Sequence, residues 1–287
     1  MAALAPNTRS AYRSCLSKFF AFTGSSSLPA STTSVALFVA HLFNAHRAPS
    51  SISLHLSALA YIHKLHSYAD PTDSFIVKKM VTGAYKLGAK PDARLPITPA
   101  ILRQIIQALP FLALSSYTTS MLKAMFLLAF FGFLRVGELT IRPGSDNSHV
   151  ISVSNLQITR LGIVLSMSSF KHNQAGRTVN LHISPQTDPL CPVKALSQYL
   201  AVRGGNLGPL FTFPDNQGIS RSFFVSHLNK VLRLAKLDTN HYKSHSFRIG
   251  AATHAVSSGI PETNIKEMGR WRSSAYKKYI RIPMLSV

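Results

Sequence analysis

The sequence has few acidic residues and few cysteines, and both shortages limit what the protein can be. Among its 287 residues, 10 are Asp or Glu and 31 are Lys or Arg, which gives a formal net charge of +21. Such an excess is best suited to a polyanionic partner, so the charge favours nucleic-acid binding. The two cysteines, Cys15 and Cys191, lie far apart and form no CxxC pair. They argue against a disulfide framework or a zinc ribbon and fit a reducing compartment.

Long apolar segments are also lacking. The most apolar run, residues 121–134, includes Lys123 and is too short to span a bilayer, so we expect a buried helix there. We expect no secretory signal, because Pro6 interrupts the chain before an apolar segment can form. Since 46% of the residues are hydrophobic and only 14% are charged, the composition indicates a globular protein. We therefore expect a soluble protein without a membrane partner, nuclear if the source is eukaryotic and otherwise cytoplasmic.

The first part of the chain, residues 1–88, has helical signals only. Apolar side chains recur with helical periodicity. The expected helices are residues 8–22, 34–46, 51–68 and 72–87. This part is richer in Lys and Arg than in acids, so a helical domain that grips DNA with a basic face is one interpretation. A helical domain with ordinary solvated lysines is the other.

A linker is predicted at residues 89–97, because Gly88, Pro91 and Pro96 interrupt the chain and no apolar period survives. The second domain, residues 98–287, opens at Thr98-Pro99, a helix cap followed by proline at the first helical position. The next expected helix, residues 116–131, is apolar on nearly all sides and therefore central to the core.

A small antiparallel sheet is predicted in the middle of the second domain. Short β-branched stretches separated by turn residues indicate strands at 149–153, 156–159, 163–168 and 178–183. Lys171 lies in or beside the hairpin turn between the last two. Helical signals then return at residues 192–203, 220–236, 246–257, 261–268 and 273–280. The predicted fold class is mainly α, with this small sheet in the second of two domains.

Arg135 directly follows the apolar helix, so its guanidinium needs an anion or a carboxylate partner. Glu138 is close enough in sequence to provide one. Taken alone, the pair is most simply a structural ion pair.

A second group of polar residues stands near the C-terminus. His245 and Arg248 are three residues apart and would project from one face of a helix. Trp271 and Tyr279 follow. Phosphoryl transfer by a protein nucleophile needs stabilisation of the negative charge on the non-bridging oxygens, a nucleophile in line and a proton for the leaving oxygen. Two arginines, a phenol and Lys171 as acid could supply these.

The order of these residues resembles the tyrosine recombinases, the family of phage integrases, bacterial chromosome-dimer resolvases and recombinases of eukaryotic mobile elements. The matching pieces are Arg135-Val-Gly-Glu138, Lys171, His245-Ser-Phe-Arg248, Gly269-Arg-Trp271 and Tyr279-Ile-Arg281. The C-terminal block looks most like the crypton-type and DIRS-type branch. The resemblance runs from about Asn7 to the end, and its first part looks like the family's core-binding domain. It implies a two-domain, C-shaped clamp around DNA.

The resemblance also implies roles for the residues. Arg135 and Arg248 would clamp the scissile phosphate, with His245 assisting and Glu138 supporting the site. Lys171 would protonate the leaving 5′-hydroxyl, and Trp271 would fill a position that is His in many members. Tyr279 would form a 3′-phosphotyrosyl link. Neither metal nor ATP would be needed. Strand exchange would run through a Holliday junction in a homotetramer on two duplexes, without a small-molecule substrate.

Several alternatives remain open at this point. Tyr276 competes with Tyr279 as the nucleophile, although the Ile-Arg after Tyr279 matches the family better. Arg177 is the basic alternative to Lys171. His241 and His245 could form a metal pair, but no acid or cysteine accompanies them. The residues expected to contact the DNA backbone, rather than to form a solvated basic face, are Lys243, Arg270, Arg272, Lys277, Lys278 and Arg281.

Three functions fit these residues. The first is a site-specific recombinase that integrates or excises a mobile element. The second is a relaxing enzyme like the type IB topoisomerases, which share this set of residues. The third is a domesticated DNA-binding protein that has kept the fold without catalysis; its sign would be a missing catalytic residue, and none is evidently missing.

Overall fold

The computed structural model describes residues 4–88, 91–170, 173 and 177–281. It divides into two compact units, Met1–Asp92 and Ala93–Val287. The division falls inside the segment 89–97 that the sequence predicts as a linker. Each unit has a hydrophobic core of its own, as expected of a domain that can fold by itself.

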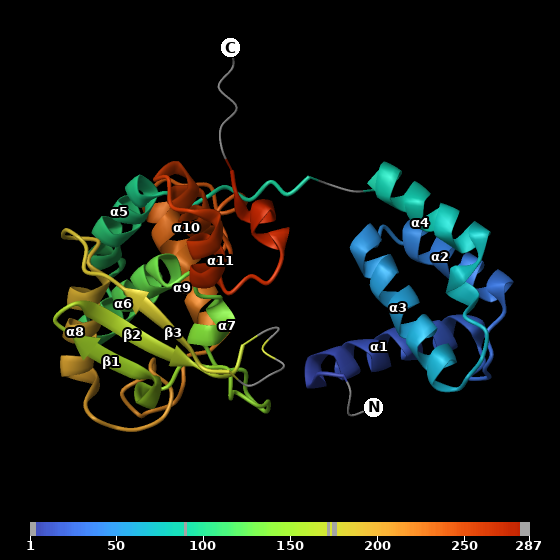
Figure 1. Ribbon diagram of the computed structural model, residues 1–287, viewed down its shortest axis with the longest axis horizontal. Helices are drawn as coiled ribbons and strands as arrows, with labels where there is room; N and C mark the ends of the chain where they lie inside the picture. The colour runs from blue at the N-terminus through green and yellow to red at the C-terminus, as the bar shows by residue number, and fades with distance from the viewer. Residues whose placement is uncertain (1–3, 89–90, 171–172, 174–176, 282–287) are drawn as a thin grey trace, which may run out of the picture. The chain divides into compact units, whose positions relative to one another are not determined.

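In the part of the first unit that the structure describes, four α-helices surround one apolar core (Figure 1). They are α1 (Pro6–Thr23), α2 (Thr32–Asn44), α3 (Pro49–Leu65) and α4 (Phe75–Gly88), with a 3₁₀ turn at Pro71–Asp73. Phe19 and Phe38 are almost fully buried and meet edge to face, with 5.2 Å between ring centres. The predicted helices are confirmed, and their ends shift by at most three residues.

The second unit is mainly helical. Its described helices are α5 (Pro99–Ala108), α6 (Ser116–Phe131), α7 (Val136–Leu139), α8 (Pro192–Arg203), α9 (Arg221–Leu234), α10 (Ser246–Ser257) and α11 (Glu262–Gly269). There are 3₁₀ turns at Leu109–Leu112, Val153–Asn155 and Ser274–Tyr279 (η4). The side chains of Thr98 and Ser115 cap α5 and α6 by accepting from backbone N–H groups in the first turn. The expected last helix is thus a 3₁₀ turn, which lies directly after α11 in the chain.

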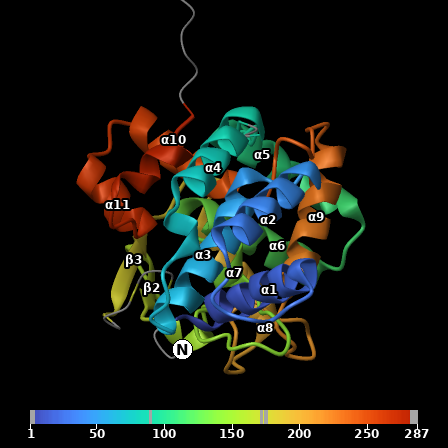
Figure 2. The same ribbon diagram turned by 90° about the vertical axis from the view of Figure 1, so that its right-hand side faces the viewer.

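One small sheet lies beside these helices in the described part of the unit. Its strands β1 (Leu156–Thr159), β2 (Gly162–Met167) and β3 (Val179–Ile183) pair antiparallel in the order β1-β2-β3. Alternate residues of β2 are buried, so one face of the sheet covers the core. Figures 1 and 2 show β3 next to α11. The predicted fold class, mainly helical with a small antiparallel sheet, is confirmed.

The prediction of a further strand at residues 149–153 is wrong. Ser152 forms only an isolated bridge with Pro209, and a 3₁₀ turn begins at the next residue. Ile151 is buried; its N–H donates to the carbonyl of Glu138 at 2.9 Å, and its own carbonyl accepts from Leu210 at 2.8 Å. These apolar residues pack into the core without pairing as a strand. Periodicity alone cannot distinguish a buried loop segment from a buried strand.

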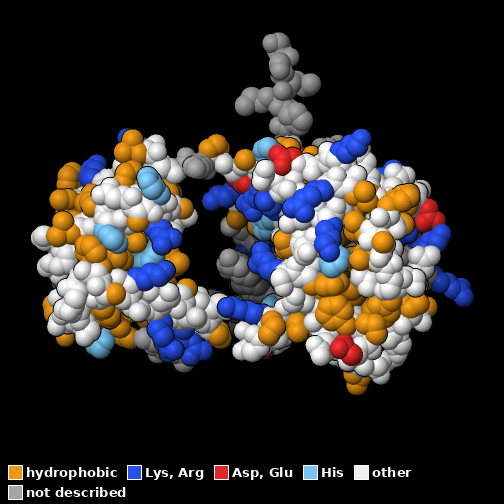
Figure 3. Space-filling view, turned by 180° about the vertical axis from the view of Figure 1, so that it is seen from behind, with side chains coloured by type: hydrophobic (Ala, Val, Ile, Leu, Met, Phe, Trp, Pro, Cys, Tyr) orange, Lys and Arg blue, Asp and Glu red, His pale blue; other side chains and the backbone are white. Residues whose placement is uncertain are grey.

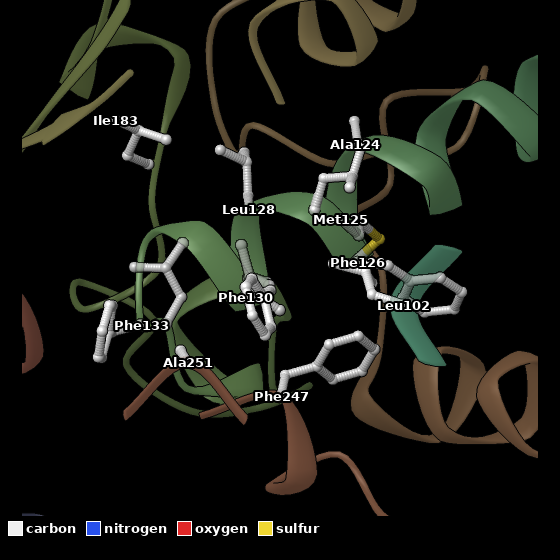
Figure 4. Packing of buried hydrophobic residues seen from close by; sticks show 14 of the residues in the cluster. Leu102, Ala124, Met125, Phe126, Leu128, Phe130, Phe133, Ile183, Phe247 and Ala251 are labelled. Atoms are coloured by element: carbon white, nitrogen blue, oxygen red, sulfur yellow. The ribbon is translucent and has the colours of Figure 1, made fainter. Parts of the chain in front are cut away.

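Helix α6 is the centre of the second core, as its apolar composition predicts. Residues 124–130 are all buried. Phe126 stacks on Phe247 of α10 with 5.5 Å between ring centres and meets Phe224 of α9 edge to face at 5.3 Å. Figure 4 shows Phe126, Phe130 and Phe247 within this packing. The contact between Phe126 and Phe247 holds α6 against α10. The C-terminal end of α6 then leads to Arg135.

The chain enters the second unit along α10. The N–H of Leu95 donates to the carbonyl of His241, and that of Ile97 to the carbonyl of Ser246, each at 3.0 Å. Ile97 is fully buried, and a Cβ on Gly250 would lie 1.8 Å from its carbonyl oxygen. Leu95 and Ile97, expected to lie in a linker, are therefore hydrogen-bonded to the second unit, and Ile97 is packed into it.

Two further expectations concern membranes and disulfides. Among the described residues, no helix is both long and apolar enough to cross a membrane. Cys15 and Cys191 are buried and unbridged, and they lie in different units. Burial raises the pKa of the Cys15 thiol, which suits an unreactive core residue.

Candidate active site

Arg135 lies just beyond a left-handed turn that ends α6. The N–H of Leu134 donates to the carbonyl of Ala129 at 3.1 Å, and Phe133 has a φ of 49°. Glycine is usual at such a position, but here Gly132 comes one residue earlier. The turn gives Arg135 an extended backbone at the start of α7.

Arg135 and Glu138 form the ion pair that the sequence predicts. Nη1 of Arg135 lies 3.1 Å from Oε1 of Glu138, and the backbone N–H of Arg135 donates to Oε2 at 2.8 Å. The carboxylate thus fixes both ends of the arginine. The side chain of Glu138 is only 4% exposed, whereas that of Arg135 is 22% exposed. The guanidinium can therefore reach a ligand from solvent.

Arg248 lies inside α10 and is fully buried. Its guanidinium donates to the carbonyl oxygens of Phe133, at the end of α6, and Gly269, at the end of α11. Burial, together with repulsion from Arg135 and Arg270, lowers the pKa of Arg248 to about 9. It is protonated at neutral pH, so a fixed positive charge lies where three segments meet.

Two aromatic rings lie against this charge, and the ring of His245 lies beside one of them. The Cζ atom of Arg248 lies 4.2 Å from the ring centre of Trp271 and 5.5 Å from that of Tyr279. Tyr279 in turn lies 5.0 Å from His245 and 5.1 Å from Trp271 between ring centres. The indole covers Gly269 so closely that a Cβ there would lie 1.7 Å from it. Residues far apart in the chain thus form one site.

The two tyrosines of η4 have different environments. Tyr276 is 5% exposed, and its ring lies 6.2 Å from that of Trp271. Burial, followed by hydrogen bonding to Glu262, raises the pKa of Tyr276. A raised pKa opposes loss of the phenol proton. Tyr279 is partly exposed and lies beside Arg248, as a nucleophile requires.

Thr253 ties the Tyr279 segment to α10. Its hydroxyl donates to the carbonyl of Tyr279 at 3.3 Å and accepts from the N–H of Arg281 at 3.0 Å. The threonine lies five residues after Arg248 on the same helix. Nothing in the sequence pattern marks this residue, because the bonds involve backbone atoms of a distant segment.

The predicted acid, Lys171, lies outside the described residues, so its role stays a prediction. The alternative, Arg177, is exposed and contributes to a groove of about 690 Å³ between β3 and α11. Trp271 and Arg270 line the same groove. The groove therefore borders the candidate site at Trp271.

Most of the residues expected to contact DNA are on the surface. Lys243, Arg272, Lys277 and Lys278 are exposed. Arg281 is half-buried, with its guanidinium donating to the carbonyl of Lys278 at 2.7 Å. In Figure 3, Lys and Arg side chains outnumber Asp and Glu on the visible face of the second unit. DNA contact by these residues stays a prediction.

Arg270 is the exception, and the expectation of an exposed position is wrong. Its side chain is 1% exposed, and Nη2 lies 2.7 Å from Oε2 of Glu138. The reason is local: Arg270 ends α11 in a left-handed conformation with φ of 54°, which turns its side chain inward.

No described group of three or more His, Cys, Asp and Glu side chains is arranged to hold a metal ion. His241, which the sequence offers as a ligand with His245, instead pairs through Nδ1 with Asp238 at 2.8 Å. Nothing within the described residues therefore favours the alternative of a metal pair.

Comparison with known proteins finds similar integrases and recombinases. No family model matches the chain. A stretch of 159 residues is 29% identical to an integrase/recombinase XerD homolog of Selenomonas ruminantium. That stretch covers 53% of this chain but only 44% of the relative, so the chain spans less than half the length of this relative.

Solved structures match almost the whole chain at low identity. An integrase of the transposon Tn1549, in complex with transposon right-end DNA, covers 99% of this chain and 92% of its own, with a TM-score of 0.69 and 12% identity. A λ integrase tetramer on a Holliday junction covers 97% and 73%, with a TM-score of 0.66 and 15% identity. XerH recombinase on its difH substrate covers 94% and 75%, with a TM-score of 0.66 and 12% identity. The chain therefore has the fold of the tyrosine recombinases and resembles one of their relatives in sequence.

Proposed function

We propose that this chain is a tyrosine recombinase that cuts and rejoins double-stranded DNA through a covalent bond to Tyr279. One observation carries the proposal: Arg135, His245, Arg248, Trp271 and Tyr279 come from separate segments and meet at one site. The fold supports it, because several solved structures that share this fold are complexes with DNA. The net charge of +21 suits the same partner.

The reaction follows from the chemistry of these side chains. The phenol oxygen of Tyr279 attacks phosphorus and passes its proton to the neighbouring imidazole of His245, and a new oxygen–phosphorus bond forms. The bond to the 5′ oxygen breaks, and that oxygen takes a proton from Lys171, the acid that the family resemblance assigns. Arg135 and Arg248 hold the negative charge of the non-bridging oxygens. The phosphotyrosyl link keeps the energy of the original bond, so rejoining needs no ATP.

Access to Arg248 sets a condition on this reaction. The guanidinium is fully buried, and the rings of Trp271 and Tyr279 lie on it. A phosphate can meet Arg248 only after these rings have shifted. Of these two rings, that of Tyr279 lies in η4, so we expect DNA binding to rearrange this short 3₁₀ turn, an element with little intrinsic stability.

The biological setting is the finer part of the proposal. By resemblance to the crypton-type and DIRS-type branch, the recombinase would integrate or excise a mobile element and act in a nucleus. Strand exchange would proceed through a Holliday junction held by four copies of the chain. The λ integrase tetramer bound to a Holliday junction is a precedent for such an assembly on the same fold.

The test is the trapping of a covalent protein–DNA adduct. Fragments of the source genome carrying single-strand nicks would be incubated with the protein and denatured in SDS. We expect an adduct that is resistant to SDS and absent for Tyr279→Phe. Sequencing the trapped DNA then gives the target site.

Other outcomes point to other functions. Relaxation of supercoils without recombinant products indicates the topoisomerase-like alternative. Salt-sensitive binding without any adduct indicates a non-catalytic DNA-binding protein and overturns the proposal.

A further inference from the structure

Arg270 is a buried charge next to the site that the proposed reaction does not use. Nη2 pairs with Oε2 of Glu138 at 2.7 Å, and the guanidinium lies 3.4–3.5 Å from the carbonyl oxygens of Gly132 and Phe133. Arg248 is equally buried but lies against the ring of the proposed nucleophile, Tyr279. The side chain of Arg270 is 1% exposed and meets only Glu138 and two carbonyl oxygens. Its contacts are thus with groups that support the site.

The first neighbour is Glu138, whose carboxylate is shared by two arginines. Oε1 accepts from Nη1 of Arg135 at 3.1 Å, while Oε2 accepts from the Arg135 backbone at 2.8 Å and from Arg270. Arg270 thus holds the same carboxylate oxygen that accepts from the Arg135 backbone. Without it, Glu138 keeps only its bonds to Arg135, and the position of both side chains is less firmly fixed.

The second neighbour is the carbonyl oxygen of Phe133, which accepts from both Arg248 and Arg270. Phe133 and Arg270 are both left-handed residues after a helix, with φ of 49° and 54°. Through this oxygen, Arg270 holds the end of α6 against the end of α11. It therefore influences the position of Arg248 as well as that of Arg135.

The backbone conformation of Arg270 is unfavourable for a residue with a side chain. Glycine adopts a φ of 54° without strain, while a side chain with a Cβ adopts it at a cost. The residue ends α11 in the position where glycine is most common. An arginine at a position that favours glycine is explained by the contacts of its guanidinium.

We propose that Arg270 is a positioning residue for the phosphate clamp, which sets Arg135 through Glu138 and Arg248 through the carbonyl of Phe133. The inference rests on the proposed function, because a clamp has meaning only if the chain cleaves DNA. It assigns to Arg270 a function other than the DNA-backbone contact that its sequence context suggests.

The experiment compares Arg270→Gly and Arg270→Lys with Arg272→Ala in the full chain. Arg272 is exposed two residues away and serves as the matched control. Two quantities are measured on nicked duplex: the rate constant of adduct formation at saturating DNA, and DNA affinity across salt concentrations. We expect both Arg270 variants to slow cleavage by about 100-fold, the cost of a misplaced catalytic group. Their affinity and its salt dependence should stay as in the wild type.

A neutral substrate separates positioning from a general loss of structure. In a scissile methylphosphonate, a methyl group replaces one charged oxygen, so the clamp has less charge to hold. If Arg270 acts through the clamp, Arg270→Gly should slow cleavage of this substrate by about tenfold or less. A general structural defect slows both substrates equally and overturns the inference.

Arg270→Gly leaves Glu138 buried with Arg135 as its one charged partner. The double variant Arg270→Gly with Glu138→Gln removes this unbalanced charge and provides a second comparison. Slow cleavage by this double variant supports the inference. Cleavage at the wild-type rate overturns it, as does a loss of affinity and salt dependence like that of Arg272→Ala. If the wild type itself forms no adduct, the proposed function fails first and the positioning role fails with it.

Discussion

Arg270 and Arg272 are two residues apart, yet one lies in the interior and the other in solvent. Arg270 meets a carboxylate and two carbonyl oxygens, and Arg272 belongs to an exposed basic surface with Lys277 and Lys278. The left-handed backbone at residue 270 makes the difference. Two arginines in one short segment therefore have different environments, and their closeness in sequence does not predict a shared role.

The two tyrosines of η4 repeat the contrast. Tyr276 is buried against Trp271 and tied to Glu262, while Tyr279 is partly exposed beside Arg248 and His245. Only Tyr279 combines access with neighbouring positive charge. This difference in environment favours Tyr279 as the nucleophile. It adds a physical reason to the family match of the Ile-Arg that follows Tyr279.

The largest effect is expected from the tyrosines. Tyr279→Phe removes the attacking oxygen and should abolish the adduct, because no other group can replace it. Tyr276→Phe should still form the adduct, with a stability loss of about 1 kcal/mol for one hydrogen bond. SDS gels of both variants decide between the residues. If only Tyr276→Phe abolishes the adduct, the roles are reversed.

Arg248→Lys should come next. Lysine keeps the charge but cannot reproduce the planar fork that engages two carbonyl oxygens. We expect cleavage to slow by about 10²–10³-fold, the usual cost of one lost oxyanion donor. Arg233→Lys, at an exposed position on α9, is the control and should cleave normally. Single-turnover kinetics measure both, and equal rates would contradict a role for Arg248.

The interior and the surface arginine should differ sharply in stability. Arg270→Met leaves Glu138 buried with only one charged partner, and removing one member of a buried pair costs about 3–5 kcal/mol. Arg272→Met should change the free energy of unfolding by no more than about 0.5 kcal/mol. Urea unfolding measures both values. Similar values for the two variants would mean that the burial of Arg270 carries no energetic weight.

The exposed lysines should affect DNA affinity alone. If each of them neutralises one phosphate, Lys277→Ala or Lys278→Ala should reduce the slope of log K against log salt by about 0.9. Cleavage at saturating DNA should not change. Binding measured between low and moderate salt tests this, and an unchanged slope would place both lysines outside the interface.

The smallest effect concerns Glu262, which holds Tyr276. A hydrogen bond from Lys266, and then one from Tyr276, lowers the pKa of Glu262. Because the folded pKa lies below the unfolded value of about 4.3, the contribution of Glu262 to stability is present above that pH. It is lost as the pH falls through the folded pKa. Glu262→Gln should flatten this part of the stability curve, and an unchanged curve would exclude the interaction.

Much of the architecture could be predicted from sequence because it depends on local signals. The apolar run of α6, the cap at Thr98 and the turn residues around β2 indicated the elements and the fold class. The pairing of Arg135 with Glu138 also followed, since a charge after a buried helix needs a partner close by. The family resemblance contributed the remaining site residues.

What could not be predicted depends on contacts between distant segments. Nothing in the sequence tells that Thr253 bonds to the backbone around Tyr279. The inward direction of the Arg270 side chain depends on a left-handed backbone conformation, which arginine rarely adopts. The apolar residues at 150–151 have the composition of a strand but pack beneath α7 without a partner strand. Each case is decided by tertiary structure.

The close approach of Gly250 to Ile97 determines where the polypeptide can be truncated to give an isolated second unit. An isolated second unit that began at Thr98 would lose the fully buried side chain of Ile97 and leave the carbonyl of Ser246 without its donor. It would also lack Leu95, whose N–H donates to the carbonyl of His241, four residues before His245. A second unit that keeps its candidate site intact must therefore start by about Ala93, so residues 93–97 belong to this unit as much as its helices do.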